Sequence, residues 1–463
     1  MHALLLIHRY LGLGFGALIL LWCGSGVVTM YVTYPKLAES RRLRALTPLD
    51  WSSAPLASKL PSDLSADGRL EMLAGRPVLS QRSRDGARII DLATGRVQSR
   101  VSVAQATAVA AAYAPAGWRP RIELLGTNDL DQWTVSGQFA VDRPLYHFAL
   151  GDDDGSELYV SSSTGRLVQA TTRKQRFWNW LGPIPHWLYW VQLRQRPELW
   201  TQVVIVGALG GALLTVSGLW LGLRRLPERP AGSAQRARAW HRLNGLIFAL
   251  FTLTWLGTGL LTVQPWGLLE SPVLADEQLH GRAPSPTQIE QAVRAFQTNI
   301  SGRPFVSVEI NHADIAPFLV ASTADGQRTR FDATGRPAPL VERDFENLAR
   351  RLGSAQPATR LLEADDDLVA AHVQAAALPV YRVLLPGGER RALYLDAASG
   401  ALLAQIDRNA RILQWLEGVH RVDLLPLLRR RPLWDGLLWA LLSGIAVLCG
   451  TGVWLGYRRL FVR

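Results

Sequence analysis

Four long apolar stretches divide the chain and predict four membrane-spanning helices. They run over Leu11–Tyr34, Trp200–Leu223, Leu243–Val263 and Leu433–Tyr457. Each approaches or exceeds the ~20 residues that a helix needs to cross ~30 Å of hydrocarbon. No charged residue interrupts the first three stretches, and only Asp435 lies at the edge of the fourth. The pattern therefore predicts a multi-pass membrane protein.

Two sets of motifs occur twice, so the sequence predicts an internal repeat. The first set, around the first and third stretches, recurs after 233 residues: His8–Gly12 with Trp22–Gly26, and His241–Gly245 with Trp255–Gly259. The second set lies at the second and fourth stretches: His186-Trp187 with Gly218–Arg225, and His420-Arg421 with Gly452–Arg459. A long repeat of this kind determines the architecture. Since each half holds two spans, both halves have the same orientation, related by a pseudo-two-fold axis along the membrane normal.

The net charge of +12 indicates membrane topology rather than a nucleic-acid partner. Arginines gather between the second and third stretches and at the C-terminus: Arg224, Arg225, Arg229, Arg236, Arg238, Arg242, Arg458, Arg459 and Arg463. Short arginine-rich loops remain in the cytoplasm. We therefore expect both termini in the cytoplasm and the long segments 36–199 and 264–432 on the outer side.

The cysteine content limits the chemistry of the chain. Its two cysteines, Cys23 and Cys449, lie within apolar stretches. They exclude a disulfide framework, a cysteine-based metal site and covalent heme attachment through Cys-x-x-Cys-His. The apolar N-terminal stretch is too long for a signal peptide and has no clear small-residue cleavage site, so we expect a retained anchor.

The outer segments mix helical and β patterns, which predicts α+β domains. Helical periodicity covers residues 104–113, 287–296 and 341–352, and β-rich runs cover 132–139, 146–150, 306–310 and 381–385. Four turn signatures predict hairpin connections, closed by Gly95, Gly165, Gly335 and Gly400. The acidic runs 152–154 and 365–367 predict solvated turns, and residues 38–61 predict a linker.

A series of ordered motifs fills the last part of the chain: Tyr394–Asp396 with Ser399-Gly400, Gln414–Leu416, Gly418–His420, Arg430–Trp434 and Gly452–Arg459. These motifs resemble the PepSY-associated transmembrane family, and His8–Gly12 and His241–Leu243 resemble its other signature. Characterised members are inner-membrane reductases that bind b-type heme and reduce ferric siderophores at the periplasmic side. The resemblance therefore implies iron acquisition. The first outer domain matches the PepSY module loosely. The sequence that ends at His186 is Pro-Ile-Pro-His, whereas the matching sequence that ends at His420 is Gly-Val-His.

The expected fold is a membrane all-α four-helix transmembrane bundle of two parallel pseudo-repeats, with two periplasmic α+β PepSY-like domains in the bacterial inner membrane. The expected boundaries are 8–34 for the first transmembrane helix, 36–176 for the first periplasmic domain, 177–225 for a His-bearing interfacial segment with the second helix, 226–240 for a cytoplasmic loop, 241–265 for the third helix, 266–408 for the second periplasmic domain, and 409–459 for a second His-bearing segment with the fourth helix.

His8 and His241 occupy matched positions at the inner ends of the first and third spans. A solvated interfacial histidine beside Arg9 is the ordinary interpretation of His8 alone. An ionisable group at a membrane span is nevertheless a functional hypothesis by default. Because the pseudo-axis brings matched positions face to face, the pair fits the axial ligation of heme iron. We expect one heme b at this pair.

His186 and His420 form a second matched pair, each 38 residues before the paired arginines of its span. Both lie on Trp-rich approaches, where an aromatic belt at the outer interface with an unrelated histidine is the alternative. Symmetry predicts a second heme b here. Arg9, Arg242 and Arg421 follow ligand candidates and suit heme propionates, although snorkelling or topology explains Arg9 and Arg242 equally well.

The ligand histidines need hydrogen-bond acceptors for their second ring nitrogen. Asn244 or the backbone is a candidate at the inner pair, and Asp423 lies near His420. We expect the remaining histidines at ordinary terminal, surface or core positions: His2, His147, His280, His312 and His372. The sequence shows no nucleophile–base pair and no phosphate-binding or dinucleotide fingerprint, so any other redox cofactor must come from a partner.

The sequence and the resemblance together predict a di-heme b-type reductase, with catalytic residues unknown. It would take electrons from an unknown inner donor and reduce a periplasmic ferric siderophore, and its other partner is membrane lipid. A second hypothesis is a heme-free PepSY membrane protein that binds or regulates a periplasmic peptidase or partner, because PepSY modules also occur in peptidase propeptides. A third keeps the hemes but uses quinol or another periplasmic acceptor.

Overall fold

The computed structural model of the 463-residue chain describes most of the sequence. The residues it leaves undescribed are 1, 52–55, 58–59, 84–85, 115–120, 225–232, 273, 275, 301–302, 355–357, 364–377, 386–390 and 462–463. The chain divides into two compact units. Unit 1 comprises residues 1–34, 174–271 and 409–463, and unit 2 comprises residues 35–173 and 272–408.

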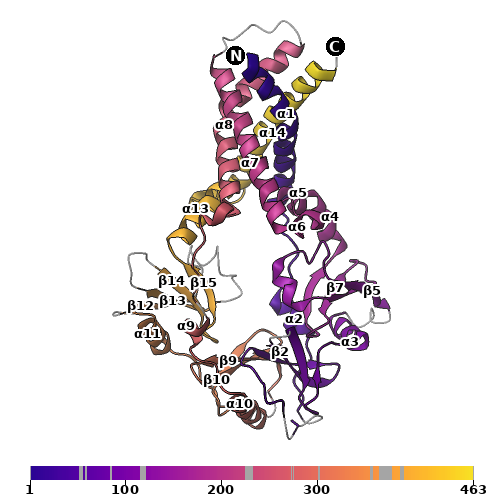
Figure 1. Ribbon diagram of the computed structural model, residues 1–463, viewed down its shortest axis with the longest axis vertical. Coiled ribbons are helices and arrows are strands. Elements are labelled where there is room, and N and C mark those ends of the chain that lie inside the picture. The colour runs from indigo at the N-terminus through magenta and orange to yellow at the C-terminus, as the bar shows by residue number, and fades with distance from the viewer. Residues whose placement is uncertain are drawn as a thin grey trace. The chain divides into compact units, whose positions relative to one another are not determined.

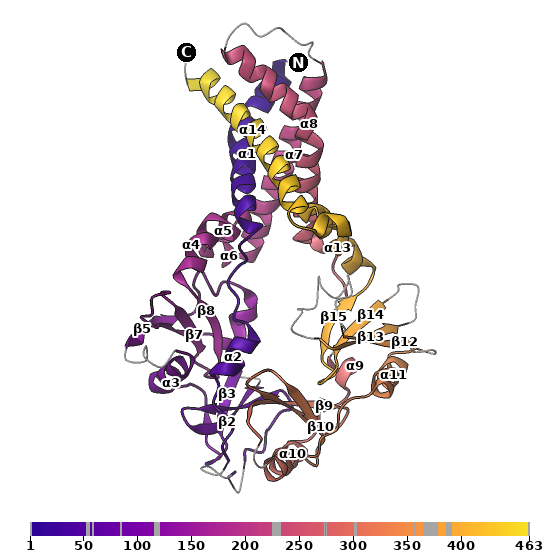
Figure 2. The ribbon, with the colours of Figure 1, turned by 180° about the vertical axis from the view of Figure 1, so that it is seen from behind.

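Unit 1 is a bundle of four long apolar helices, each long enough to cross a membrane (Figure 1). They are α1 (His2–Thr29), α7 (Pro197–Arg224), α8 (Ser233–Thr262) and α14 (Leu433–Phe461). Helices α1 and α8 each pack against both α7 and α14, as Figure 2 also shows. Helices α1 and α8 therefore face each other across the bundle. The predicted four-helix bundle of a multi-pass membrane protein is confirmed.

The same phenylalanine–glycine contact holds the helices together in both halves of the bundle. Phe15 of α1 lies directly against Gly210 of α7, and Phe248 of α8 lies directly against Gly444 of α14. A methyl group at either glycine would collide with the facing ring. Small residues allow this close approach of helices in lipid. The sequence repeat is thus also a repeat of side-chain packing.

Short helices connect the bundle to unit 2. Before α7 they are α4 (Arg173–Leu181), α5 (Pro183–His186) and α6 (Val191–Arg194), and after α8 they are η3 (Pro265–Gly267), α13 (Arg408–Arg421) and η5 (Pro426–Arg429). Exposed aromatic side chains occur along α4 and at η3, at Phe177, Trp178, Trp180 and Trp266. His186 lies at the end of α5, and His420 lies in the last turn of α13.

Unit 2 contains a seven-stranded antiparallel sheet built from both of its chain segments, 35–173 and 272–408. Its strand order is β11-β10-β9-β1-β2-β3-β4. The strands are β1 (Gly68–Leu73), β2 (Arg76–Ser83), β3 (Gly86–Asp91), β4 (Val97–Gln98), β9 (Phe305–Ala313), β10 (Ala316–Thr323) and β11 (Arg328–Phe331). The two segments meet where β1 pairs with β9. The sequence did not predict this pairing.

Two four-stranded antiparallel sheets complete unit 2, and each packs with one helix. The first is β5 (Glu123–Asn128), β6 (Leu145–Ala149), β7 (Glu157–Ser161) and β8 (Leu167–Thr171), with α3 (Val103–Tyr113). The second is β12 (Ala358–Leu362), β13 (Val380–Leu385), β14 (Arg391–Asp396) and β15 (Leu402–Ile406), with α11 (Glu342–Arg351). Helix α10 (Pro286–Asn299) buries its apolar face against the seven-stranded sheet. Among the described residues, unit 2 also contains α2 (Glu39–Ala45), η2 (Gly137–Asp142) and α9 (Asp276–His280).

Most of the predicted outer elements are confirmed. The helices at 104–113, 287–296 and 341–352 are α3, α10 and α11, and the runs at 146–150, 306–310 and 381–385 lie in β6, β9 and β13. The four turn glycines have φ values of +71° to +73°, as glycine-closed turns require: Gly95, Gly165, Gly335 and Gly400. Asp152 accepts a hydrogen bond from the Ser156 backbone within the turn between β6 and β7.

Two outer predictions are wrong. Residues 132–139 form no strand, because Asp131 accepts a hydrogen bond from the backbone N–H of Trp133 and residues 137–142 form η2. Trp133 and Val135 are buried together with their polar neighbours Gln132 and Thr134, so the segment lacks the two-faced burial of a half-exposed strand. The predicted linker at 38–61 contains α2, and Leu43 and Leu60 within it are buried. The acidic run 365–367 and His372 lie outside the described residues.

Candidate functional site

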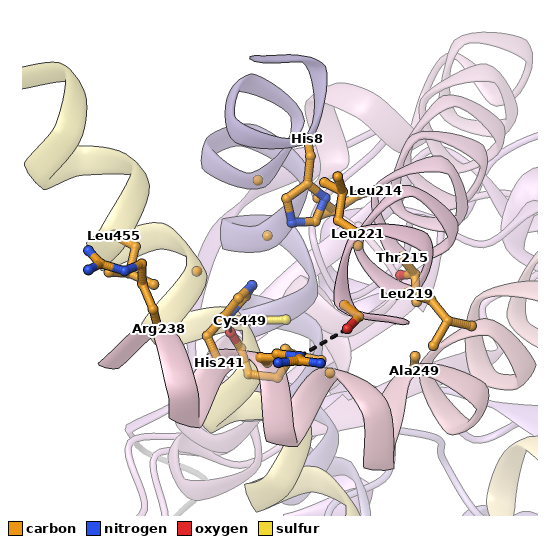
Figure 3. A pocket seen from close by; sticks show the side chains of 18 of the residues that line it. His8, Leu214, Thr215, Leu219, Leu221, Arg238, His241, Ala249, Cys449 and Leu455 are labelled. Carbon is orange, nitrogen blue, oxygen red and sulfur yellow. Dashed lines mark hydrogen bonds between the residues drawn. The ribbon is translucent and has the colours of Figure 1, made fainter. Parts of the chain in front are cut away.

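The structure brings the two histidines of the predicted inner pair together. His8 of α1 and His241 of α8 lie on opposite sides of the bundle interior (Figure 3), with ring centres 6.2 Å apart and an interplanar angle of 56°. The packing of the repeated apolar helices explains this placement, because α1 and α8 lie diagonally opposite each other in the bundle. Residues 233 positions apart therefore face one interior space.

The predicted outer pair is also brought together, with nearly the same geometry. The ring centres of His186 and His420 are 6.4 Å apart, and their interplanar angle is 59°. Burial lowers the pKa of His186, and burial together with the charge of His186 lowers the pKa of His420 to about 4. Both imidazoles are therefore neutral at pH 7, which is the form that ligates a metal ion.

Each of the four imidazoles packs against a glycine of a neighbouring helix. A Cβ atom on the glycine would lie close to the imidazole Cε1: 2.6 Å for Gly218 and His8, 2.9 Å for Gly452 and His241, 3.4 Å for Gly26 and His186, and 3.1 Å for Gly259 and His420. Cβ contacts below 3.0 Å do not occur without a shift of one partner. The glycines thus provide the room in which the rings lie.

The residue before each glycine carries a hydroxyl group within hydrogen-bond distance of the imidazole Nδ1. The distances are 3.1 Å for Ser217 and His8, 3.2 Å for Thr451 and His241, 3.4 Å for Ser25 and His186, and 3.0 Å for Thr258 and His420. We call these four Ser-Gly or Thr-Gly pairs the histidine seats: Ser217-Gly218, Thr451-Gly452, Ser25-Gly26 and Thr258-Gly259.

Hydrogen bonds at the seats favour a proton on Nδ1 of each ring. A hydroxyl has a single hydrogen to donate. The seat hydroxyls donate it to carbonyls of their own helices, at 2.7–2.9 Å: Ser217 to Leu214, Thr451 to Val447, Ser25 to Leu21 and Thr258 to Thr254. They must therefore accept from Nδ1–H. The carbonyls of Leu448 and Trp22, which can only accept, also lie 3.1 and 3.2 Å from Nδ1 of His241 and His186.

With the proton on Nδ1, each neutral imidazole has its free lone pair on Nε2. Within the described part of the chain, no group forms a hydrogen bond with any of these four Nε2 atoms. A transition metal binds an imidazole nitrogen at about 2.0 Å, and the ring centre lies about 1.2 Å beyond that nitrogen. Two imidazoles on opposite sides of one metal ion thus place their ring centres about 6.4 Å apart. The observed 6.2 and 6.4 Å match this separation.

A cavity of about 770 Å³ surrounds the inner pair. Both His8 and His241 line it, together with glycines and aliphatic side chains of all four long helices (Figure 3). Binding sites for small molecules and cofactors are typically concave, mostly apolar spaces of this size. The predicted propionate partners Arg9 and Arg242 also line the cavity. The residues present therefore fit a flat, anionic macrocycle held through a central metal ion.

Of the predicted hydrogen-bond acceptors, the backbone is confirmed at His241 through the Leu448 carbonyl, whereas Asn244 and Asp423 are not partners of the histidines. The Asn244 side chain donates to the Trp240 carbonyl, and Asp423 accepts from Arg421 at 2.9 Å. Arg421, the third predicted propionate partner, is thus paired with a carboxylate of its own segment. Sequence reasoning missed the seat hydroxyls. The repetition of a Ser-Gly or Thr-Gly pair in every span is the signal that could have identified them.

Three other described histidines have neighbours of their own in unit 2: His147, His280 and His312. His147 lies 2.9 Å from a Glu157 carboxylate oxygen and stacks on Tyr159. His280 and His312 have ring centres 5.8 Å apart in unit 2. Among the described residues, no group of three or more His, Cys, Asp or Glu side chains is arranged to hold a metal ion.

One comparison with known proteins identifies a match. A family model described as PepSY-associated TM region matches residues 5–459, which include both histidine pairs and all four seats. A search of curated proteins found none that matches the chain. The match covers both halves of the sequence repeat.

Proposed function

Since the chain belongs to the PepSY-associated TM region family, we propose that this multi-pass membrane protein is a di-heme b-type reductase. His8 and His241 would hold one heme, and His186 and His420 the other. When bound, heme supplies reversible one-electron chemistry of iron. The protein would pass electrons across the bacterial inner membrane and reduce ferric siderophores, which releases iron.

The observation that carries this proposal is the shared geometry of the two histidine pairs. In each pair, two imidazoles are held through Nδ1 with their ring centres 6.2 or 6.4 Å apart, and their Nε2 atoms would hold the iron. A structural zinc ion is a poorer fit, because it requires four tetrahedral ligands. The described residues offer two per site. A planar macrocycle provides the other four ligands itself.

The two pairs lie at different depths of the bundle, which suits transfer across a membrane. On α1, Ser25 in the seat of His186 lies 17 residues after His8. On α8, Thr258 in the seat of His420 likewise lies 17 residues after His241. At 1.5 Å per residue these levels are about 26 Å apart. With both histidines of a pair holding it, the heme would serve electron transfer rather than oxygen activation.

The charge distribution supports the proposed orientation. Arginines lie at the ends of the long helices nearest the inner pair, for example Arg224, Arg242 and Arg458. Arginine-rich short loops remain in the cytoplasm, so both termini would be cytoplasmic and unit 2 periplasmic. A ferric siderophore would then meet the protein on the side of the outer pair.

A pyridine-hemochrome count on the purified protein tests heme binding and pairing together. We expect two hemes in the wild type and one in each of the single variants His8→Ala, His241→Ala, His186→Ala and His420→Ala. His2→Ala, on the same helix as His8, is the matched control and should retain both. Protein without heme absorbance after expression with sufficient heme would contradict the proposal and favour the heme-free, partner-binding function.

The substrate is tested by reoxidation of the heme-loaded protein. Protein reduced with dithionite should be reoxidised by a ferric siderophore faster than by unrelated oxidants. Equal rates with all oxidants, or faster reoxidation by a quinone, would assign a different acceptor while leaving the heme sites intact.

A further inference from the structure

The cavity around His8 and His241 carries an excess of positive charge at its inner end. Four arginines line it, and no aspartate or glutamate of the described residues does: Arg9, Arg238, Arg242 and Arg459. Two propionates of a single heme would neutralise two of the four charges. The remaining pair is available to another anion.

Arg238 and Arg459 are placed to bind that second anion. Arg238 lies one helical turn before Arg242 on α8, and Arg459 lies seven residues after Gly452 on α14, so both belong to the cavity-facing stripes of their helices. Both side chains are exposed, and among the described residues neither has a carboxylate partner. By contrast, Arg242 donates from Nε to the Gly222 carbonyl.

We propose that Arg238 and Arg459 form a binding site for a phosphate group at the inner mouth of the cavity. Arginine binds phosphate with bidentate, charge-assisted hydrogen bonds. Basic pockets between transmembrane helices on the cytoplasmic side bind phospholipid head groups. The same cavity is lined by Leu243 and Leu246, which are 50% and 39% exposed. The phosphate belongs either to an anionic lipid, with its tails on these leucines, or to a soluble phosphorylated electron donor.

This inference rests on the proposed function, because the charge count assigns two arginines to heme propionates. Equilibrium dialysis of radiolabelled inorganic phosphate against the full-length protein in phosphatidylcholine nanodiscs tests it. We expect saturable binding that weakens about tenfold in Arg238→Gln and in Arg459→Gln. Arg458→Gln is the matched control: Arg458 neighbours Arg459 but stacks on Trp454, and it is not among the cavity-lining residues. Its affinity should equal that of the wild type.

A second arm separates the two sources of phosphate. In nanodiscs containing phosphatidylglycerol, loss of inorganic phosphate binding identifies a lipid head group as the occupant. Unchanged binding identifies a soluble phosphorylated ligand. Either result supports the site.

Measurement of heme content in the same samples distinguishes failure of this inference from failure of the proposed function. Phosphate binding that is unchanged in both arginine variants, or reduced equally in Arg458→Gln, would overturn the phosphate site. The phosphate site would also be overturned if the wild type bound no phosphate and both Arg238→Gln and Arg459→Gln lost heme. The two arginines would then serve the propionates. Phosphate binding by heme-free protein would support the site and refute only the heme proposal.

Discussion

His8 and His241 place their ring centres 6.2 Å apart, although 233 residues separate them along the chain. His186 and His420 repeat this relationship at 6.4 Å. The repeat therefore produces two sites, each of which takes one histidine from either half. A histidine pair that takes one residue from each half requires both halves to fold, so a change in one half alters a site that the halves share.

The seat hydroxyls should orient the ligands. Ser217→Ala removes an acceptor from Nδ1 of His8, and loss of such partners costs 10–100-fold in metal affinity. We therefore expect Ser217→Ala to lose the inner heme during purification while it retains the outer heme. The hemochrome count and the reduced absorbance spectrum measure this.

Ser217→Thr is the conservative control for this hydroxyl. Thr451 has the same role in the second half of the chain, so a threonine at position 217 should restore heme retention. Equal loss in Ser217→Thr and Ser217→Ala would show that packing, rather than the hydroxyl, determines the effect.

Gly218, the glycine in the seat of His8, should tolerate no side chain. A Cβ atom on Gly218 would lie 2.6 Å from Cε1 of His8, whereas one on Gly26 would lie 3.4 Å from Cε1 of His186. Gly218→Ala should thus displace its histidine and abolish the inner site, while Gly26→Ala should weaken the outer site only slightly. Gly24→Ala, with no neighbour within 4 Å, controls for a general effect of alanine on the helix. Similar heme losses in all three variants would contradict this explanation.

The sequence predicted the bundle and both histidine pairs because these features depend on long-range regularities that are written into the chain. Apolar length identifies a span, and a constant offset identifies residues that symmetry brings together. The seat hydroxyls were not predicted, because which residue faces Nδ1 depends on the rotation of each helix within the bundle. The repeated Ser-Gly and Thr-Gly pairs became interpretable only once that rotation was known.

Unit 2 was less predictable, because its sheet joins distant segments. The pairing of β1 with β9 brings Gly68 beside Ile310, and no local pattern specifies such a partner. The error at 132–139 has a different origin. The polar Gln132 and Thr134 are buried as well as Trp133 and Val135, and the Asp131 side chain accepts a hydrogen bond from the Trp133 backbone within a turn.

The phenylalanine–glycine contacts should contribute to bundle stability. A methyl group at Gly210 would overlap the ring of Phe15, and overpacking of this kind costs about 1–3 kcal/mol. Gly210→Ala should therefore lower the unfolding temperature in detergent, as should Gly444→Ala against Phe248. In the double variant Phe15→Ala with Gly210→Ala, the added methyl group has space, so the two effects should not be additive. Additive losses would show that the ring and the glycine act independently.

In unit 2, an ion-pair network connects α2 to the seven-stranded sheet. The buried Arg42 lies 2.6 Å from Glu39 and 2.8 Å from Glu71, and Arg69 links Glu71 to Glu309 on β9. Burial alone would raise the pKa of Glu39. The hydrogen bond and charge of Arg42, with the charges of Arg69 and Arg166, outweigh that effect and hold the pKa at about 2.

The depressed pKa of Glu39 predicts how unit 2 responds to acid. Because the folded-state pKa lies below the ordinary value of 4.5, the Glu39 carboxylate stabilises the fold above pH 4.5, and this contribution is lost as the pH falls towards 2. Hydrogen exchange of the β1 amides in the full-length protein, corrected for intrinsic rates, should show protection that declines across this window. Glu39→Gln should lower protection at pH 7 and flatten the decline, whereas Glu346→Gln, which removes a surface pair with Arg350 on α11, should do neither. A wild-type pH profile in Glu39→Gln would show that Glu71 and Glu309 suffice to balance Arg42 and Arg69.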